Sequence, residues 1–380
     1  MEPQNNSRFT KLDGLRGLLS LIVCLNHSFL VVTIPTFANV WAQNPLIFHD
    51  LQAKLQQLFM LIGNGGAAVT LFFLLSGLVL GQSLSKIKMN LRGLFGFIVK
   101  RLIRLYPVYI FLLIATTVYM KTGFVYQTFP FSSTWFNWWM HFQMTFKEFI
   151  LNFFFIHIYI GGVTWTLRVI IITSFLFPLF YLLNKKTTWW LDLLIGILLI
   201  YLSFTVLNIP GFRDFRYLYM FYLGLIIPKF RVFFSNIPNR LVCVLLPFAV
   251  CLMLGFRYLI NNEYQGGVIE ALISFFLIGL SAYGSQASVL NFLENSFFKF
   301  YGKISYSLYL IHFSILYIFS KLMFNYLPNL PYPSHYFLIH FSLFLVTTVI
   351  ATGVSYLVYR LIELPAHTLS IQVGKKISGE

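Results

Sequence analysis

The feature that most constrains this chain is a series of apolar runs that recur along nearly its whole length. An α-helix crosses the ~30 Å hydrocarbon core of a bilayer with about 20 predominantly apolar residues. Short polar and basic segments separate the runs, which is the pattern of a multi-pass membrane protein. The sequence predicts an all-α polytopic membrane protein of about ten transmembrane helices, at about residues 17–34, 65–80, 105–121, 164–183, 189–207, 215–227, 241–256, 268–283, 304–324 and 336–361.

Composition favours a membrane protein over a soluble one. Hydrophobic residues make up 58% of the 380 positions and charged residues only 10%, whereas ordinary soluble domains carry about 25% charged residues. In a soluble protein the net charge of +16 would suggest nucleic acid as a partner. Here basic loops on one side of a bilayer explain the charge. We therefore expect membrane lipid, and no nucleic acid, among the partners.

The basic residues also predict an orientation. Nineteen of the 27 Lys and Arg residues lie on one predicted side, seven lie on the other, and Arg168 falls within a span. Since basic loops favour the cytoplasm, we expect both termini there. No cleavable signal peptide, soluble domain or linker is evident. The expected organisation is one membrane domain over residues 8–366 and a basic cytoplasmic tail over residues 367–380. Within the domain we expect a loop over residues 38–63, and we expect the last helix to end at Pro365.

One face of the first span carries charged and titratable groups. Arg16 and His27 are eleven positions apart, about three helical turns, so both project from the same face, as does Asp13. The spacing corresponds to roughly 16 Å along the helix, which places His27 near the bilayer midplane if Arg16 is at the surface. Such groups must face protein or water. His27 is either a packing histidine or a general base, and the shared face favours the second role. Arg16 would pair with Asp13 or hold an anionic substrate group.

A second basic pair opens the third span. Arg101 and Arg104 are three positions apart and would form a two-pronged anion clamp facing the cytoplasm. The diphosphate of a coenzyme A thioester is one anion that would fit. Anchoring at the membrane surface, or lipid phosphate binding, explains the same residues, and for this pair the two interpretations stay open.

Other polar residues lie within the apolar runs. Ser76 is followed by Gly77, a pair that more often serves helix packing. Trp165 precedes Arg168, a cation that needs a partner or an aqueous cavity. Tyr306 and His312 lie in the ninth span, where His312 is either a satisfied core histidine or part of a site. None of the three cysteines has metal-ligand or disulfide spacing.

Taken in order, these segments resemble the acyltransferase-3 family of integral membrane acyltransferases. The similar segments are Phe9 to His27 with the family's Arg-x10-His spacing, Phe72 to Gly77 (Phe-Phe-x-x-Ser-Gly), Arg101 to Pro107 (Arg-x-x-Arg-x-Tyr-Pro), Trp165 to Pro178 with Thr166 in place of a serine, Ser305 to His312 (Ser-Tyr-x-x-Tyr-x-x-His) and Tyr359 to Pro365 (Tyr-Arg-x-x-Glu-x-Pro). Each segment is modest alone, but six in the right order across nearly the whole chain are specific.

The resemblance implies that an acyl group, most often acetyl, moves from cytoplasmic acetyl-CoA or another acyl-CoA to a hydroxyl, commonly of a cell-surface glycan. It implies a saccharide acceptor, no metal, and a bacterial inner or plasma membrane location. By this resemblance His27 matches the essential histidine, Arg16 its partner, and Arg101 and Arg104 the pair that contacts the donor.

In this interpretation Asp13 and Arg16 position His27, while Ser76, Trp165, Arg168, Tyr306 and His312 line a central polar cavity. One departure is Ile170, at a position where the family usually has an acidic residue. A rival function from another class is a transporter that moves a glycan or an acylated intermediate through the same cavity. The acceptor, the acyl chain and the oligomeric state are not predicted.

Overall fold

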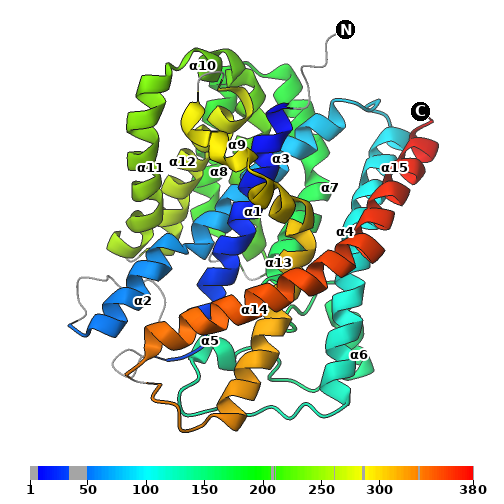
Figure 1. The fold of residues 1–380 in the computed structure, drawn as a ribbon. Coiled ribbons are helices and arrows are strands. Elements are labelled where there is room, and N and C mark those ends of the chain that lie inside the picture. The colour runs from blue at the N-terminus through cyan, green and yellow to red at the C-terminus, as the bar shows by residue number, and fades with distance from the viewer. Residues whose placement is uncertain are drawn as a thin grey trace.

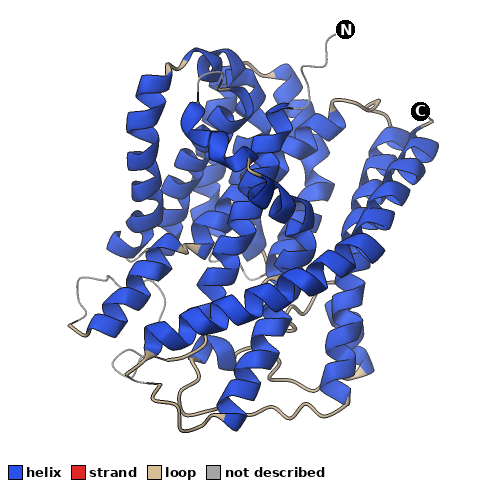
Figure 2. Cartoon of the chain, in the orientation of Figure 1, coloured by secondary structure: helices blue, strands red, loops and turns tan. Residues whose placement is uncertain are grey.

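The computed structural model describes residues 7–33, 49–206, 209, 211–260, 262–284, 287–332 and 334–379. Every extended regular element in these ranges is a helix (Figure 2). In chain order the elements are α1 (Ser7–Ser28), α2 (Leu51–Ile62), α3 (Gly65–Leu84), α4 (Leu91–Lys121), α5 (Thr134–Asn137), α6 (Phe146–Phe153), α7 (Thr164–Lys186), α8 (Trp189–Val206), η2 (Arg213–Tyr217), α9 (Leu218–Ile226), η3 (Ile227–Phe230), α10 (Arg231–Asn236), α11 (Asn239–Ile260), α12 (Glu263–Tyr283), η4 (Ser288–Glu294), α13 (Ser296–Tyr326), α14 (Tyr336–Val358), η5 (Tyr359–Glu363) and α15 (Leu364–Ser378).

Nine segments among the described residues are long and apolar enough to cross a membrane. They correspond to the second to tenth apolar runs of the sequence. α1 corresponds to the first run, and four charged residues in its first half, Arg8, Lys11, Asp13 and Arg16, make it less apolar than the others. The chain is therefore an all-α polytopic membrane protein, as predicted. The start of α1 and the end of α15 lie at the same end of the bundle (Figure 1).

Two local predictions are wrong. The expected loop over residues 38–63 contains α2 from Leu51 onward, because Asp50 caps that helix by accepting a hydrogen bond from the Ala53 backbone N–H at 2.8 Å. The part of the loop before residue 49 lies outside the described residues.

Pro365 does not end the last helix either. It lies in the first turn of α15, where a backbone N–H is not required, after a π-helical turn at η5. The predicted tail therefore continues as a helix along α4 (Figure 1).

α1 lies inside the bundle, against α13 and also α3, α12 and α14 (Figure 1). Glycines allow the closest of these contacts. A Cβ atom at Gly17 would lie 2.2 Å from the Phe298 carbonyl oxygen of α13, and one at Gly302 would lie 2.1 Å from the Asp13 carbonyl oxygen. The two backbones touch without intervening side chains. The polar groups that follow on α1 and α13 are consequently held face to face.

A second pair of glycines joins α3 to α9. A Cβ at Gly77 would lie 2.1 Å from the Phe221 carbonyl oxygen, and one at Gly224 would lie 2.0 Å from the Leu74 carbonyl oxygen. The relationship is reciprocal, so each glycine admits the backbone of the other helix. The Ser76–Gly77 pair thus serves helix packing through its glycine, as the sequence suggested.

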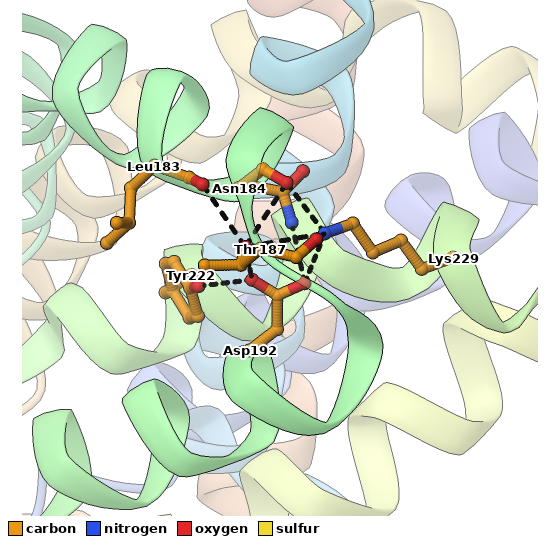
Figure 3. A network of polar contacts seen from close by, with 6 residues as sticks. All are labelled: Leu183, Asn184, Thr187, Asp192, Tyr222 and Lys229. Atoms are coloured by element: carbon orange, nitrogen blue, oxygen red, sulfur yellow. Dashed lines mark hydrogen bonds and ion pairs between the residues drawn. The ribbon is translucent and has the colours of Figure 1, made fainter.

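An ion pair between a buried carboxylate and a partly exposed lysine connects α7, α8 and η3 (Figure 3). Asp192 is fully buried and contacts Lys229, and it also accepts hydrogen bonds from Tyr222, Thr187 and Asn184 at 2.7, 2.5 and 3.1 Å. Lys229 in turn donates to the backbone carbonyls of Asn184 and Thr187 at the end of α7. The buried carboxylate is therefore paired and hydrogen-bonded, as a buried charge requires. This network fixes the α7–α8 turn and is separate from the site described below.

We expect Gly224→Ala to destabilise the protein, because the new methyl group would meet the backbone of α3. Overpacking of this kind lowers the free energy of unfolding by about 1–3 kcal/mol. The clash cannot be relieved by a side-chain rotation, because the neighbouring atoms belong to the backbone. Thermal unfolding in detergent measures the effect as a lower midpoint temperature.

The matched control is Gly353→Ala on α14, where an added Cβ has no atom within 4 Å and stability should stay the same or rise slightly. Equal midpoints for the two variants would contradict the α3–α9 contact.

Candidate active site

Two cavities inside the bundle adjoin one another. The first is about 140 Å³ and is walled by α1, α3, α4, α7 and α13. The second is about 600 Å³ and is bounded by α1, α3, α5, α7, α8, η2, α9, α12 and α13, with the loop before α7. Val69 and Tyr309 line both cavities. These two side chains are therefore the partition between one cavity and the next.

Three arginines line the first cavity: Arg16, Arg101 and Arg104. Arg16 donates a hydrogen bond to the Ser305 hydroxyl at 3.0 Å. The Asp13 carboxylate lies 3.6 Å from the Arg16 guanidinium, but Asp13 is half exposed and does not line the cavity. The Arg101 Nε atom is buried and has no hydrogen-bond partner within the described part of the chain. An unsatisfied buried donor is costly. An anionic ligand in this cavity would satisfy it.

Part of the wall of the first cavity is apolar. The apolar side chains that line it include Phe72, Phe73, Leu75, Val79 and Ile170. Ile170, which departs from the family pattern, therefore contributes to an apolar wall. Ser76 also lines this cavity. The space thus combines three arginines with apolar side chains.

Tyr306 and Glu363 tie the arginines to the surrounding helices. The Tyr306 hydroxyl donates to the Leu105 carbonyl oxygen at 2.5 Å, which joins α13 to α4 beside the arginine pair. Glu363 accepts from the Ser307 hydroxyl at 2.5 Å and from its backbone N–H at 3.2 Å. The Glu363 carboxylate also interacts electrostatically with Arg16 and Arg104. Glu363 thus offsets the repulsion between like charges, a role that sequence reasoning missed when it treated this residue as a structural end signal.

His27 lines the second cavity and contacts His312. The His27 Nδ1 and His312 Nε2 atoms are 2.9 Å apart, and the two rings meet edge to edge with their planes 14° apart. His312 is buried and lies behind His27, since it does not itself line either cavity. Its Nδ1 atom lies 2.9 Å from the Leu308 carbonyl oxygen. The two histidines, 285 positions apart in sequence, form one hydrogen-bonded pair.

This geometry specifies the tautomers of two neutral rings. A carbonyl oxygen only accepts, so the proton of His312 is on Nδ1 and its Nε2 atom is an acceptor. His27 must then donate from Nδ1 to that acceptor. The Nε2 atom of His27 is left with its lone pair. A cavity-lining imidazole in this state can accept a proton from a hydroxyl.

Aromatic rings lie close to His27. The Trp135 ring centroid is 5.2 Å away, and the Phe313 ring is 6.1 Å away at nearly a right angle. Trp135, Trp138, Trp139 and Trp165 line the second cavity. The sequence contains no signal that brings Trp135 to His27.

Arg168 has a partner and lines the second cavity. Its Nε atom lies 2.6 Å from the Asp214 Oδ2 atom of η2. The sequence indicated that this cation needs a partner or a cavity, but did not identify Asp214. On the same helix, the Thr166 hydroxyl lies 3.0 Å from the hydroxyl of Tyr309, one of the two partition residues.

The structure thus places the predicted residues in three groups. The first cavity is lined by Arg16, Ser76, Arg101, Arg104 and Tyr306. The second is lined by His27, Trp165 and Arg168. Neither cavity is lined by Asp13 or His312. Four helices, α1, α3, α7 and α13, contribute to both cavities, and α4 contributes Arg101 and Arg104 to the first.

Comparison with known proteins gives one match to a family. Residues 9–360 match the family model Acyl_transf_3, described as an acyltransferase domain. No curated protein and no solved structure matches the chain.

We expect both His27 and His312 to carry their protons on Nδ1 at neutral pH. 15N chemical shifts of labelled histidines in the detergent-solubilised protein distinguish protonated from unprotonated ring nitrogens. In His312→Phe, which keeps a ring against His27 but removes the acceptor, the Nδ1 preference of His27 should disappear. The exposed His335 provides the control, because His335→Ala should leave the His27 signals unchanged. A proton on Nε2 of His27 in the unmodified protein would contradict the assignment.

Proposed function

The chain belongs to the acyltransferase-3 family of membrane acyltransferases, and from this premise we propose that it moves an acyl group from acyl-CoA to a saccharide hydroxyl. The donor would most simply be acetyl-CoA, supplied from the cytoplasm as a co-substrate. The acceptor would be a cell-surface glycan or a lipid-linked saccharide. The observation that carries the proposal is that a small, arginine-lined cavity adjoins a histidine-lined cavity at Val69 and Tyr309.

The first cavity suits the donor. Arg101 and Arg104 would hold the diphosphate, since guanidinium groups bind phosphate oxygens in bidentate fashion, and the buried Nε of Arg101 supports this. The apolar side chains that line the same cavity suit the pantetheine arm. Arg16 and His27 are eleven residues apart on α1, roughly 16 Å. A thioester carried at the end of the arm would therefore approach the partition formed by Val69 and Tyr309.

The second cavity suits the acceptor, with His27 as general base. His27 Nε2 takes the proton of the acceptor hydroxyl while the oxygen attacks the thioester carbonyl carbon. The resulting tetrahedral intermediate collapses, the carbon–sulfur bond breaks, and the sulfur leaves as the thiolate of coenzyme A. The protonated His27 then returns its proton to that sulfur. The products are the acyl ester and free coenzyme A.

His312 acts through His27 in this mechanism and does not touch the reacting atoms. Its Nε2 atom accepts from His27 Nδ1 and so keeps the His27 lone pair on the nitrogen that is available to the cavity. It also stabilises the imidazolium that forms during proton transfer, as an acceptor on the opposite nitrogen does in other histidine bases. His312 is a positioning residue.

The rival class, a carrier that moves a glycan or acylated product, requires neither the donor arginines nor a histidine in a single tautomer. Both features support an enzyme. A carrier would move saccharide without consuming a thioester, and that outcome would contradict the proposal.

We expect the purified protein to release coenzyme A from acetyl-CoA when given a cell-envelope saccharide fraction, and His27→Ala to lower kcat by about 10²–10⁴-fold, the usual contribution of a general base. Thiol release and mass spectrometry of the saccharide measure the reaction. The variant should keep its unfolding temperature, and His335→Ala should keep full activity. If saccharide moves into vesicles with no thiol released, the protein is a carrier.

We expect Arg101→Gln and Arg104→Gln to raise KM for acetyl-CoA by about 10–100-fold, since one hydrogen bond to a charged group is worth about 1.5–3 kcal/mol. With an N-acetylcysteamine thioester, which has no nucleotide, the same variants should match the unmodified enzyme.

Arg92→Gln is the matched control, because Arg92 is exposed on the same helix α4 and lines neither cavity. An equal loss with both donors would show that the arginines act in folding or lipid binding instead.

A further inference from the structure

The proposed reaction creates a negative charge that none of the residues in the mechanism above stabilises. When the acceptor oxygen attacks the thioester, the carbonyl oxygen becomes the oxyanion of the tetrahedral intermediate. Hydrogen-bond donors fixed beside that oxygen are commonly the largest single contribution to the catalysis of acyl transfer. His27 is the proton acceptor in this step, and the proton that it gains is needed later by the sulfur. A separate donor is therefore required where the two cavities meet.

Tyr309 lies at that boundary and has a donor. Val69 and Tyr309 line both cavities, and of these two side chains only that of Tyr309 has an O–H group. Tyr309 precedes His312 on α13 by three residues, about one helical turn, and the two ring centroids are 6.1 Å apart. Tyr309 is thus beside the imidazole pair and also part of the donor cavity.

Thr166 is the hydrogen-bond partner of the Tyr309 hydroxyl. The buried Thr166 oxygen lies 2.7 Å from the Val163 carbonyl oxygen and 3.0 Å from the Tyr309 oxygen. A threonine hydroxyl has one proton, so it can serve only one of these acceptors at a time. When that proton points to Val163, Tyr309 donates to Thr166. When it points to Tyr309, the proton of Tyr309 is available to a ligand.

The Tyr309 hydroxyl has no further hydrogen-bond partner within the part of the chain that the structure describes. Its ring is held by Phe72 of α3, whose centroid is 5.6 Å away in an edge-to-face arrangement. The ring is therefore fixed by α3 and its hydroxyl by α7, while rotation of two hydroxyl groups alone presents the O–H to a ligand. A donor that needs no rearrangement of heavy atoms is what an oxyanion requires.

We propose that Tyr309 is a catalytic residue that donates a hydrogen bond to the oxyanion of the tetrahedral intermediate, with Thr166 as its positioning residue. The proposal rests on the proposed function, because it names a further residue of that reaction. As the acceptor oxygen bonds to the acyl carbon, the carbonyl double bond becomes single and its oxygen takes the electron pair. Tyr309 donates to that oxygen and keeps its proton. When the carbon–sulfur bond breaks, the double bond forms again and the electron pair leaves with the sulfur.

Tyr309→Phe tests the donor, because it keeps the ring against Phe72 and removes only the hydroxyl. We expect kcat for coenzyme A release from acetyl-CoA to fall by about 10²–10³-fold, the usual effect of losing one oxyanion donor, with KM for acetyl-CoA unchanged. This split marks an interaction that is made only in the transition state. A packing role would instead raise KM or lower the unfolding temperature, since the ring lines the donor cavity.

Thr166 provides a second test that leaves the phenol in place. Thr166→Ser keeps the hydroxyl and should keep most of kcat, whereas Thr166→Val keeps the shape, removes the hydroxyl and should lower kcat with KM unchanged. Combining Thr166→Val with Tyr309→Phe should lower kcat no further than Tyr309→Phe alone, because both changes act on one hydrogen bond.

The matched control is another tyrosine–threonine pair, which joins α13 to α14. The Tyr301 and Thr352 hydroxyl oxygens are 3.2 Å apart, and Thr352 also donates to the Thr348 carbonyl oxygen at 2.7 Å. Neither Tyr301 nor Thr352 lines a cavity described above. The two pairs are built alike and differ in position, so Tyr301→Phe and Thr352→Val should leave kcat and KM unchanged.

The outcomes separate this proposal from the enzymatic one. Full kcat in a folded Tyr309→Phe protein would overturn the oxyanion donor while leaving acyl transfer by His27 intact. Equal kcat in the Thr166→Ser and Thr166→Val proteins would overturn the positioning role of Thr166. An unmodified protein that releases no coenzyme A would reject the acyltransferase mechanism, and the role of Tyr309 with it.

Discussion

The close packing of α1 on α13 is the contact on which the rest of the structure depends. Charged and titratable groups on α1 could not face lipid without a large free-energy cost, and α13 supplies a partner for Arg16 and for His27. Backbone contact at Gly17 and Gly302 brings the helices together. Arg16 then reaches Ser305, and about three turns further on His27 reaches His312. One interface therefore aligns the basic end of the site with its imidazole pair.

The remaining helices divide between enclosing this interface and meeting the lipid. α3, α4 and α7 close the first cavity, and η2, α9 and α12 extend the second. α8 and α11 are apolar over most of their length and largely exposed, as expected of helices in contact with hydrocarbon chains. The Asp192–Lys229 pair ties the α7–α8 turn to η3 (Figure 3).

Much of the fold could be predicted because the bilayer imposes a length on each apolar run, and the runs between residues 65 and 361 are found as helices. α2 was missed because its polar Gln56 and Gln57 are buried by the bundle, which no local pattern reveals. For the site, helical periodicity placed Arg16 with His27 and Arg101 with Arg104. It could not show that His27 and His312 are paired, that Asp214 neutralises Arg168, or that Trp135 reaches His27, since these contacts depend on tertiary packing.

The central claim is that a donor held by the arginines of the first cavity reaches His27 across the partition of Val69 and Tyr309. A structure of the protein with a non-hydrolysable acyl-CoA analogue tests it most directly. The account predicts the diphosphate against Arg101 and Arg104, with the acyl carbonyl beside Tyr309 and within reach of a hydroxyl that His27 deprotonates. A nucleotide bound elsewhere on the surface, or an acyl carbonyl that ends far from His27, would contradict it.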